Sequence, residues 1–417
     1  MMKGIYDHVD DEQLKKYATL AVRAGVNVQK NQLVIIHSDI KDATFARLIQ
    51  TEAYDAEASH VVIYWSDEQA TKLFFKNAAD VHIDCIPEWE KARFKEWDDA
   101  GAAHIRIISE NLDVFKEVPA ERMSRFQKAL RTKLKDHYEK TRSHQLRWCL
   151  LAVPSFAWAT QVFPDLEQEE AIQTLWQLIL RGARADGINP IIDWTNHDRV
   201  LASRKKYLND SQFESLHFTN SQGTDLFVGL PNSHNYIGGG VKDSEGITFF
   251  PNIPTEEIFT APHKEKVSGK LVATKPLIYE GSTIDDFYLI FEEGRITNYH
   301  ASIGQKALQR LIETDEGSHY LGEIALVSNH SPLAQTDTLF YNTLFDENTA
   351  CHIGIGNASP SNLQGGSNRS VTELEEAGLN RSLLLVNVTF GSESMKVTGM
   401  KENGEGVLLM KEGEFKF

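Results

Sequence analysis

The chain has 417 residues, of which 41% are hydrophobic and 24% charged, and its 43 basic and 59 acidic residues give a net charge of −16. Because a single hydrophobic core seldom grows beyond about 250–300 residues, this length predicts two domains, and the composition excludes a disordered or collagen-like chain. The negative charge repels polyanions, so we expect no nucleic-acid partner and no binding to anionic membranes.

Three further features of the sequence indicate the cellular compartment. No apolar run approaches the roughly 20 residues that a membrane-spanning helix needs, and residues 1–18 lack the apolar segment and cleavage site of a secretion signal. Cys85, Cys149 and Cys351 lie far apart without CxxC spacing, so we expect reduced, buried thiols rather than disulfides or a thiolate zinc site. These features predict a cytoplasmic protein.

The first half of the chain alternates helix and strand patterns. Asp10 is expected to cap a helix, because positions 14, 17, 18 and 21 place apolar side chains on one face. A buried strand at residues 32–37 and a helical stripe over residues 45–53 follow. Further strands are expected at residues 60–65, 103–109 and 147–153. This alternation predicts a doubly wound parallel sheet covered by helices on both faces.

The pattern changes near Leu216. Residues 167–208 are helical in pattern and are interrupted by the sequence GINP at residues 187–190. Beyond them, strand-like stretches are punctuated by Gly, Asn and Asp turn signals. We therefore expect an N-terminal α/β domain over residues 1–213 and a mixed α+β domain over residues 214–417.

Common enzyme motifs do not explain this chain. The sequence GIGNAS at residues 354–359 resembles a dinucleotide-binding GxGxxG loop without its last glycine, but it opens no obvious helix. The sequence contains no GxxxxGK[ST], HExxH or GxSxG motif, so it does not support P-loop, zincin or serine-hydrolase chemistry.

Ionisable residues in unusual surroundings concentrate in the second half. Glu256 and Glu257 lie between prolines in the irregular stretch NIPTEEIFTAP, and Glu323 interrupts the apolar strand LGEIALV. A carboxylate in such a strand is costly to bury unless it is paired or bound to a cation. The stretch FYNTLFDENTACHIGIG adds three more ionisable side chains among aromatic and small residues: Asp346, Glu347 and His352.

Taken singly, each of these residues has a structural explanation. Glu256 and Glu257 are then surface charges, Glu323 points away from the sheet edge, and His352 is a hydrogen-bonded core histidine. Taken together, they are better explained by a metal site. Carboxylates and imidazole are suitable ligands for Zn²⁺, Co²⁺, Mn²⁺ or Mg²⁺, and a bound cation accounts for acids in apolar surroundings.

Several long, ordered blocks carry a resemblance to a known family. They are KYATLAVRAGVNVQ, GTDLFVGLPNSH, NIPTEEIFTAP, LGEIALV with the later SPLAQTDTLFYNTLFDENTACH, and EEAGLNRS. Over essentially its whole length the chain resembles the bacterial metallo-aminopeptidases of the aminopeptidase T, aminopeptidase S and PepS family. The resemblance implies an α/β domain joined to a metallopeptidase-like catalytic domain, a homodimer, and removal of N-terminal amino acids with two divalent ions. It also implies that Glu257, Glu323 and His352 ligate metal.

Three positions depart from the family pattern. Ser359 replaces a tyrosine that follows the ligating histidine, and Leu385 and Asn387 replace a ligating His-x-Asp pair. Alternate strand residues face the same side, so Leu385 and Asn387 should both face the metal site, where leucine offers no lone pair and asparagine only a neutral oxygen. A two-metal hydrolase holds its ions about 3.5–4 Å apart and needs carboxylates to offset their repulsion. We therefore expect one ion rather than two, and an impaired or altered aminopeptidase activity.

Three functions remain open from the sequence. The first is a metal-dependent hydrolase of peptides or small amine-bearing substrates, in which Glu256 is the candidate for proton transfer. The second is a catalytically silent paralogue that binds peptide or a partner subunit, and the third is a mononuclear metal enzyme with different chemistry. His330, in the loop after Glu323, is a further candidate to replace a lost ligand.

Overall fold

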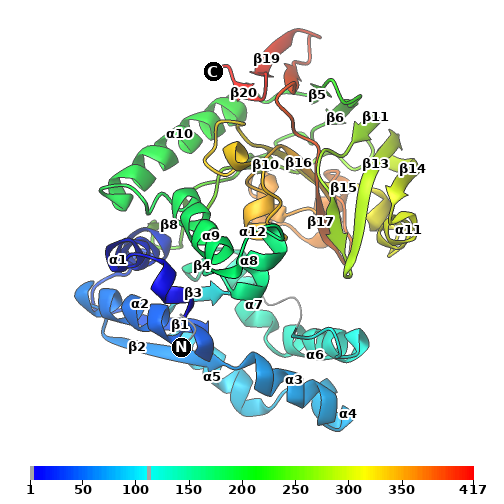
Figure 1. The fold of residues 1–417 in the computed structure, drawn as a ribbon. Coiled ribbons are helices and arrows are strands. Elements are labelled where there is room, and N and C mark those ends of the chain that lie inside the picture. The colour runs from blue at the N-terminus through cyan, green and yellow to red at the C-terminus, as the bar shows by residue number, and fades with distance from the viewer. Residues whose placement is uncertain (1–3, 110–113) are drawn as a thin grey trace. The chain divides into compact units, whose positions relative to one another are not determined.

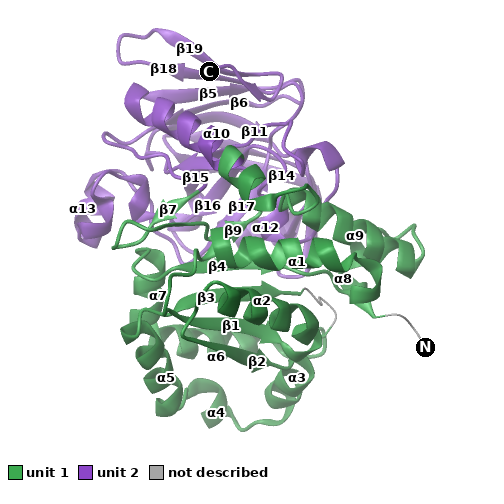
Figure 2. Ribbon diagram, turned by 90° about the vertical axis from the view of Figure 1, so that its left-hand side faces the viewer, with its two compact units in different colours: residues 1–196, 240–254 green, residues 197–239, 255–417 purple. Residues whose placement is uncertain are grey.

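The computed structural model describes residues 4–109 and 114–417. Contacts divide the chain into two compact units, which Figure 2 colours separately. Unit 1 comprises residues 1–196 and 240–254, and unit 2 comprises residues 197–239 and 255–417. The expected boundary between residues 213 and 214 divides the chain differently and stays a prediction.

Unit 1 is built on a five-stranded parallel sheet, which confirms the α/β alternation predicted from the sequence (Figure 1). The strand order is β2–β1–β3–β4–β9, and every neighbouring pair is parallel. The strands are β1 (Leu33–Asp39), β2 (His60–Ser66), β3 (Ala103–Ile108), β4 (Trp148–Ala152) and β9 (Asn252–Ile253). Sequence periodicity predicts the first four, but a two-residue strand such as β9 is too short to show a period.

Helices precede, connect and follow these parallel strands. The first begins after Asp10, whose carboxylate accepts hydrogen bonds from the backbone N–H groups of Glu12 and Gln13, as its predicted capping role requires. The helices of unit 1 are α1 (Asp11–Leu20), α2 (Ala43–Asp55), α3 (Glu68–Asn77), α4 (Asp80–Asp84), α5 (Glu88–Asp99), α6 (Ala120–Lys133), α7 (Lys135–Arg142), α8 (Phe156–Val162) and α9 (Gln168–Gly182). A further helix, α10 (Pro190–Ser211), begins in unit 1, and its residues from His197 onward belong to unit 2. A short antiparallel pair, β7 (Val241–Lys242) and β8 (Thr248–Phe249), completes the strands of this unit.

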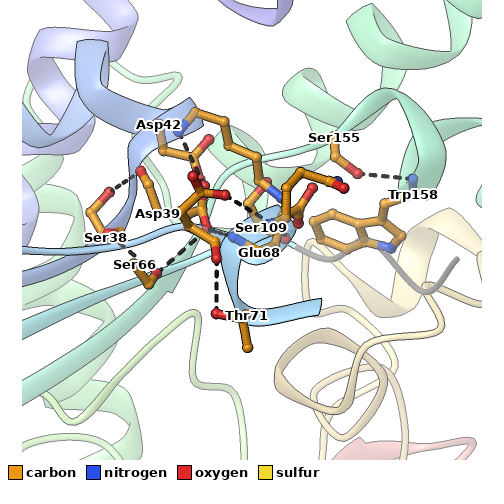
Figure 3. A network of polar contacts seen from close by, with 12 residues as sticks. Ser38, Asp39, Asp42, Ser66, Glu68, Thr71, Ser109, Ser155 and Trp158 are labelled. Carbon is orange, nitrogen blue, oxygen red and sulfur yellow. Dashed lines mark hydrogen bonds and ion pairs between the residues drawn. The ribbon is translucent and has the colours of Figure 1, made fainter. Parts of the chain in front are cut away.

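Polar side chains hold the chain where it leaves β1 and β2 (Figure 3). The carboxylate of Asp39 accepts hydrogen bonds from the backbone N–H groups of Lys41, at 3.1 Å, and of Glu68, at 2.9 Å. Asp42 is fully buried beside them, and burial raises the pKa of its carboxyl to about 7. The Asp39 contacts satisfy backbone groups at the starts of two helical segments, which is a structural role.

A large antiparallel sheet is the main sheet of unit 2. Its strand order is β12–β13–β11–β6–β5–β18–β19–β20, and β14 pairs with β13. The strands are β5 (Ser215–Thr219), β6 (Asp225–Gly229), β11 (Val267–Val272), β12 (Leu277–Tyr279), β13 (Ser282–Glu292), β14 (Arg295–Ile303), β18 (Lys396–Met400), β19 (Gly406–Lys411) and β20 (Glu414–Phe415). Helix α11 (Gln305–Ile312) contacts β13 and β14 and buries four apolar side chains.

A smaller antiparallel sheet in unit 2 carries the candidate site. Its order is β10–β15–β16–β17, with bounds Ile258–Thr260, Leu321–Leu326, His352–Gly356 and Leu385–Thr389. All residues of β15 and β16 are buried, so a charged side chain on these central strands lies in the interior. Two short helices, α12 (Thr343–Asp346) and α13 (Val371–Glu376), lie in the connections. Unit 2 thus confirms the predicted mixed α+β class.

The structure also bears on the cysteines and on membrane insertion. Within the described ranges, no helix is both long and apolar enough to cross a bilayer. All three cysteines are free thiols, and Cys149 and Cys351 are buried. Cys85 is exposed, so the expectation of a buried thiol is wrong there, because this residue follows the short surface helix α4 rather than a core strand.

Candidate metal centre

Three predicted site residues meet on the smaller sheet of unit 2. Glu257 directly precedes β10, Glu323 is the third residue of β15, and His352 begins β16. Nε2 of His352 lies 3.2 Å from Oε2 of Glu257 and 3.4 Å from Oε1 of Glu323. In a tetrahedral site with bonds of about 2.0–2.1 Å, neighbouring ligand atoms lie about 3.3 Å apart. The three side chains therefore present one ligand atom each at the spacing of a zinc-type site.

The strand register brings these side chains to one face of the sheet. Glu323 pairs with Gly354 of β16, and Gly354 pairs with Asn387 of β17. A Cβ atom at Gly354 would lie 2.9 Å from Cβ of Glu323 and 3.2 Å from Oδ1 of Asn387. The glycine thus leaves the space in which side chains from the neighbouring strands converge. His352, two residues before Gly354, faces the same side.

Solvent screens this group of charges only weakly. His352 is fully buried, and Glu257 and Glu323 are 8% and 9% exposed. Burial raises the pKa of Glu257, which the neighbouring His352 partly offsets. Burial lowers the pKa of His352, but the two carboxylates raise it more, so the net shift is well above its usual value. The group therefore retains protons unless a cation replaces them.

Two buried atoms of the group lack hydrogen bonds. Among the described residues, neither Oε2 of Glu257 nor Nε2 of His352 makes a hydrogen bond of acceptable geometry. Nδ1 of His352 lies 3.3 Å from the carbonyl oxygen of Ala350. An Nδ1–H that donates to this carbonyl leaves the Nε2 lone pair facing the carboxylates, which is the form in which imidazole binds metal. The donor set of two carboxylates and one imidazole fits a divalent ion.

Glu347 is a fourth ionisable residue beside this group. It directly follows α12, and its carboxylate accepts a hydrogen bond from Nδ2 of Asn387 at 3.4 Å. Burial raises the pKa of Glu347 well above its usual value, and the negative charge of Glu257 raises it further. The sequence places Glu347 among ionisable residues near His352, but a short helical turn carries it, so no strand pattern selects it over Asp346.

Leu385 and Asn387 face the same side of the sheet, as predicted. A Cβ atom at Gly354 would meet Cδ1 of Leu385 at 2.5 Å as well as Oδ1 of Asn387. Leu385 is 46% exposed, so it lies at the rim of the group, whereas Asn387 is partly buried. Oδ1 of Asn387 makes no hydrogen bond within the described part of the chain, which leaves one neutral oxygen at this position.

The remaining candidate residues are bonded elsewhere. Oε2 of Glu256 lies 3.7 Å from Nε2 of His197, and the hydroxyl of Ser359 lies 2.9 Å from that of Ser361. The side chain of His330 is 74% exposed, and its Nδ1 lies 3.3 Å from Oε2 of Glu414. None of the three predicted residues belongs to the group of mutually close ligand atoms formed by Glu257, Glu323 and His352. These residues lie in loops, where sequence spacing does not determine the direction of a side chain.

Comparisons with known proteins agree over the full length of the chain. A family model described as thermophilic metalloprotease (M29) matches residues 10–415. The chain is 40% identical over 406 residues to aminopeptidase AmpS of Bacillus subtilis, covering 97% of this chain and 99% of that protein. It is 35% identical over 404 residues to aminopeptidase T of Thermus aquaticus, covering 97% and 98%.

A solved structure supports the same relationship. The structure of AmpT from Thermus thermophilus superposes with a TM-score of 0.90 at 36% identity, covering 97% of this chain and 99% of that one. This match confirms the predicted combination of a parallel sheet with antiparallel sheets. With a matching family model and several close full-length relatives, the chain belongs to the M29 family of metallopeptidases.

Proposed function

We propose that this protein is a metal-dependent aminopeptidase-like hydrolase that holds one divalent ion through Glu257, Glu323 and His352. Its relatives are named aminopeptidases. The observation that carries the proposal is the spacing of the three ligand atoms, 3.2 and 3.4 Å from the shared imidazole nitrogen. The substrate class is a peptide or a small amine-bearing molecule, because buried carboxylates attract a protonated amino group.

The side chains of this site have separate tasks in the proposal. Glu257, Glu323 and His352 would hold a divalent ion, which when bound would make a water more acidic and polarise a carbonyl oxygen. Glu347 takes a proton from the attacking water and returns it to the leaving amino group, because burial and the charge of Glu257 raise its pKa well above the usual value. Asn387 holds the Glu347 carboxylate through its amide N–H. Glu256, the candidate from the sequence, remains the alternative proton carrier.

Substitutions at three family positions support an impaired or altered activity with one ion. Leucine at position 385 supplies no ligand, and asparagine at position 387 supplies at most a neutral oxygen. Two divalent ions would face only three carboxylates, those of Glu257, Glu323 and Glu347, and the excess positive charge would be buried. The position at which the family pattern has a tyrosine is occupied by Ser359 in this chain. One ion of Zn²⁺, Co²⁺, Mn²⁺ or Mg²⁺ therefore fits these residues better than two.

A catalytically silent paralogue that binds peptide or a partner subunit is the main alternative. It is favoured by Leu385, which at 46% exposure places an apolar side chain where the family pattern has an imidazole. A mononuclear metal enzyme with different chemistry is a third possibility, since one fold hosts several reactions. A homodimer located in the cytoplasm is part of the same proposal, and light scattering would test the oligomeric state.

Metal analysis combined with an activity assay tests this proposal. The protein is purified without chelator, its metal content is measured, and hydrolysis of amino-acid p-nitroanilides is assayed with Zn²⁺, Co²⁺ or Mn²⁺. We expect slow, metal-dependent hydrolysis that Glu323→Gln abolishes and that Glu347→Gln reduces more than Glu256→Gln. Metal bound at Glu323 without hydrolysis would favour different chemistry, and no metal at Glu323 would favour the silent paralogue.

A further inference from the structure

A second group of metal-ligand atoms lies wholly within unit 1, outside the centre described above. Asp98, His104 and His137 each offer one ligand atom, and these atoms lie within 4.8 Å of one another. Asp98 lies near the end of α5, His104 is the second residue of β3, and His137 is the third residue of α7. Nδ1 of His137 is 2.8 Å from Oδ1 of Asp98. Three separate elements of one unit thus converge on one point.

The second imidazole of this group has an unpaired nitrogen. His104 is 6% exposed, and its Nε2 makes no hydrogen bond within the described residues. Its Nδ1 lies 3.0 Å from Nε2 of His37 on β1. An Nδ1–H of His104 that donates to His37 leaves the buried Nε2 lone pair available to bind a cation.

Aromatic side chains exclude water from this group. The ring of Phe94 lies 4.8 Å from that of His137, and the ring of Trp97 lies 6.3 Å from that of His104. The Asp98 side chain is only 3% exposed and the His137 side chain 13%. A carboxylate and imidazoles in such surroundings are costly to bury, and an imidazole nitrogen without a partner adds to that cost. A hydrogen-bonded Asp98–His137 pair explains why two of the three side chains can be buried. It does not explain the buried His104, whose Nε2 has no hydrogen-bond partner among the described residues.

We propose that Asp98, His104 and His137 form a second metal site, which binds one Zn²⁺ ion per chain and joins α5 and α7 to β3. Ligand atoms around a tetrahedral Zn²⁺ ion lie about 3.3 Å apart, and the ligand atoms of the Asp98–His137 pair are 2.8 Å apart.

His37 is a positioning residue for this site rather than a ligand. Its Nε2 faces His104, and it also lines a cavity of about 350 Å³ at the carboxyl ends of β1, β2 and β3. Solvent in that cavity reaches His37, the residue that orients His104. The cavity therefore gives an ion a path toward the three proposed ligands. Loss of such an orienting hydrogen bond commonly weakens metal binding by about 10- to 100-fold.

The test uses the full chain with the first centre disabled by Glu257→Gln and Glu323→Gln. After removal of metal by a chelator, titration calorimetry with Zn²⁺ should give one ion per chain. Zinc should also raise the melting temperature by several degrees, since it binds the folded state preferentially. Absence of stoichiometric zinc in this double variant would overturn the proposal. Because the first centre is already disabled, this outcome is independent of the proposed aminopeptidase function.

Variants in the same background identify the ligands. Asp98→Asn and His104→Gln should each abolish stoichiometric binding, and His37→Phe should weaken it about 10- to 100-fold. His82→Gln, at an exposed histidine of α4, is the matched control and should bind zinc like its parent. Should His104→Gln fail to fold, the Asp98→Asn variant, which keeps side-chain shape, still decides the question. Unchanged zinc binding in Asp98→Asn would assign the ion to other residues and overturn the proposal.

Discussion

Asn387 donates a hydrogen bond from its Nδ2 to Oε2 of Glu347 over 3.4 Å, and so joins β17 to the residue that follows α12. Glu347 lies close enough to Glu257 and Glu323 that their negative charges raise its pKa. The amide of Asn387 therefore stabilises the carboxylate of Glu347 beside the two other carboxylates. An aspartate at position 387 could stabilise Glu347 only if a cation were bound between them. This contact makes position 387 a sensitive probe of metal occupancy.

The variant Asn387→Asp should be less stable than the parent without metal, and zinc should stabilise it more than it stabilises the parent. In chelator it exchanges a hydrogen-bond donor for a like charge beside Glu347, and we expect a loss of about 1–3 kcal/mol in the free energy of unfolding. With excess Zn²⁺ the added carboxylate becomes a ligand, and the variant should be stabilised more by zinc than the parent. Thermal melts in both conditions measure this. Equal destabilisation in both conditions would show that no ion contacts position 387.

The double variant Leu385→His with Asn387→Asp should bind two ions in the centre of unit 2. It adds one imidazole and one carboxylate on the strand face that already carries Glu323 and His352. The test is calorimetric titration with Zn²⁺ or Co²⁺ in a background of Asp98→Asn. The number of ions bound per chain should rise from one to two, and peptidase activity should increase. Each single change should leave the stoichiometry at one, and Ser359→Tyr is the next addition. An unchanged stoichiometry would mean that the group has repacked around the new histidine.

The variants Glu323→Gln and His352→Ala should both lose the metal of this centre but differ in apo stability. Glu323→Gln removes one of several like charges, so the metal-free protein should be equally or more stable. His352→Ala leaves a cavity and two facing carboxylates, and should cost about 2–4 kcal/mol. Denaturant unfolding in chelator measures both. A large loss of stability in Glu323→Gln would instead make Glu323 a structural ion-pair partner of His352.

Gly354→Ala should disrupt the centre through packing alone. The added Cβ would meet Cβ of Glu323 at 2.9 Å, an atom too close to the backbone to move freely. We expect a destabilisation of about 1–3 kcal/mol and weaker metal binding. Gly4→Ala is the control, because its Cβ would meet only a carboxylate oxygen at 3.7 Å. Metal binding of Gly354→Ala at parent affinity would argue that Glu323 is not a ligand.

Stability should fall with rising pH because of Asp42 in unit 1. Burial raises the pKa of its carboxyl from 3.8 to about 7, so between these values the folded state holds a proton that the unfolded state has released. The contribution of Asp42 should therefore decrease by about 3 kcal/mol between pH 5 and 8. Asp42→Asn, which mimics the protonated form, should reduce this slope in urea unfolding by the contribution of Asp42. Asp55→Asn, at an exposed position, should keep it.

Part of the metal centre could be predicted from local sequence context. Glu323 and His352 stand out because acids and histidines are rare in short apolar strands, and both lie on the buried strands that this pattern indicates. Glu347 does not stand out, because it follows a four-residue helix in which neighbouring acids look alike. Its importance arises only when β17 brings Asn387 within 3.4 Å of it.

The sequence by itself determined the order and type of most elements, because hydrophobic periodicity and caps such as Asp10 are local properties of the chain. It also determined which residues were available to bind metal. Only the tertiary structure decided which of them meet: that Glu256 faces His197, that His330 faces Glu414, and that β9 joins the parallel sheet. It also brought Asp98, His104 and His137 together from two helices and a strand. These contacts depend on strand register and on how separate elements pack, and both are set by long-range burial that no short stretch of sequence encodes.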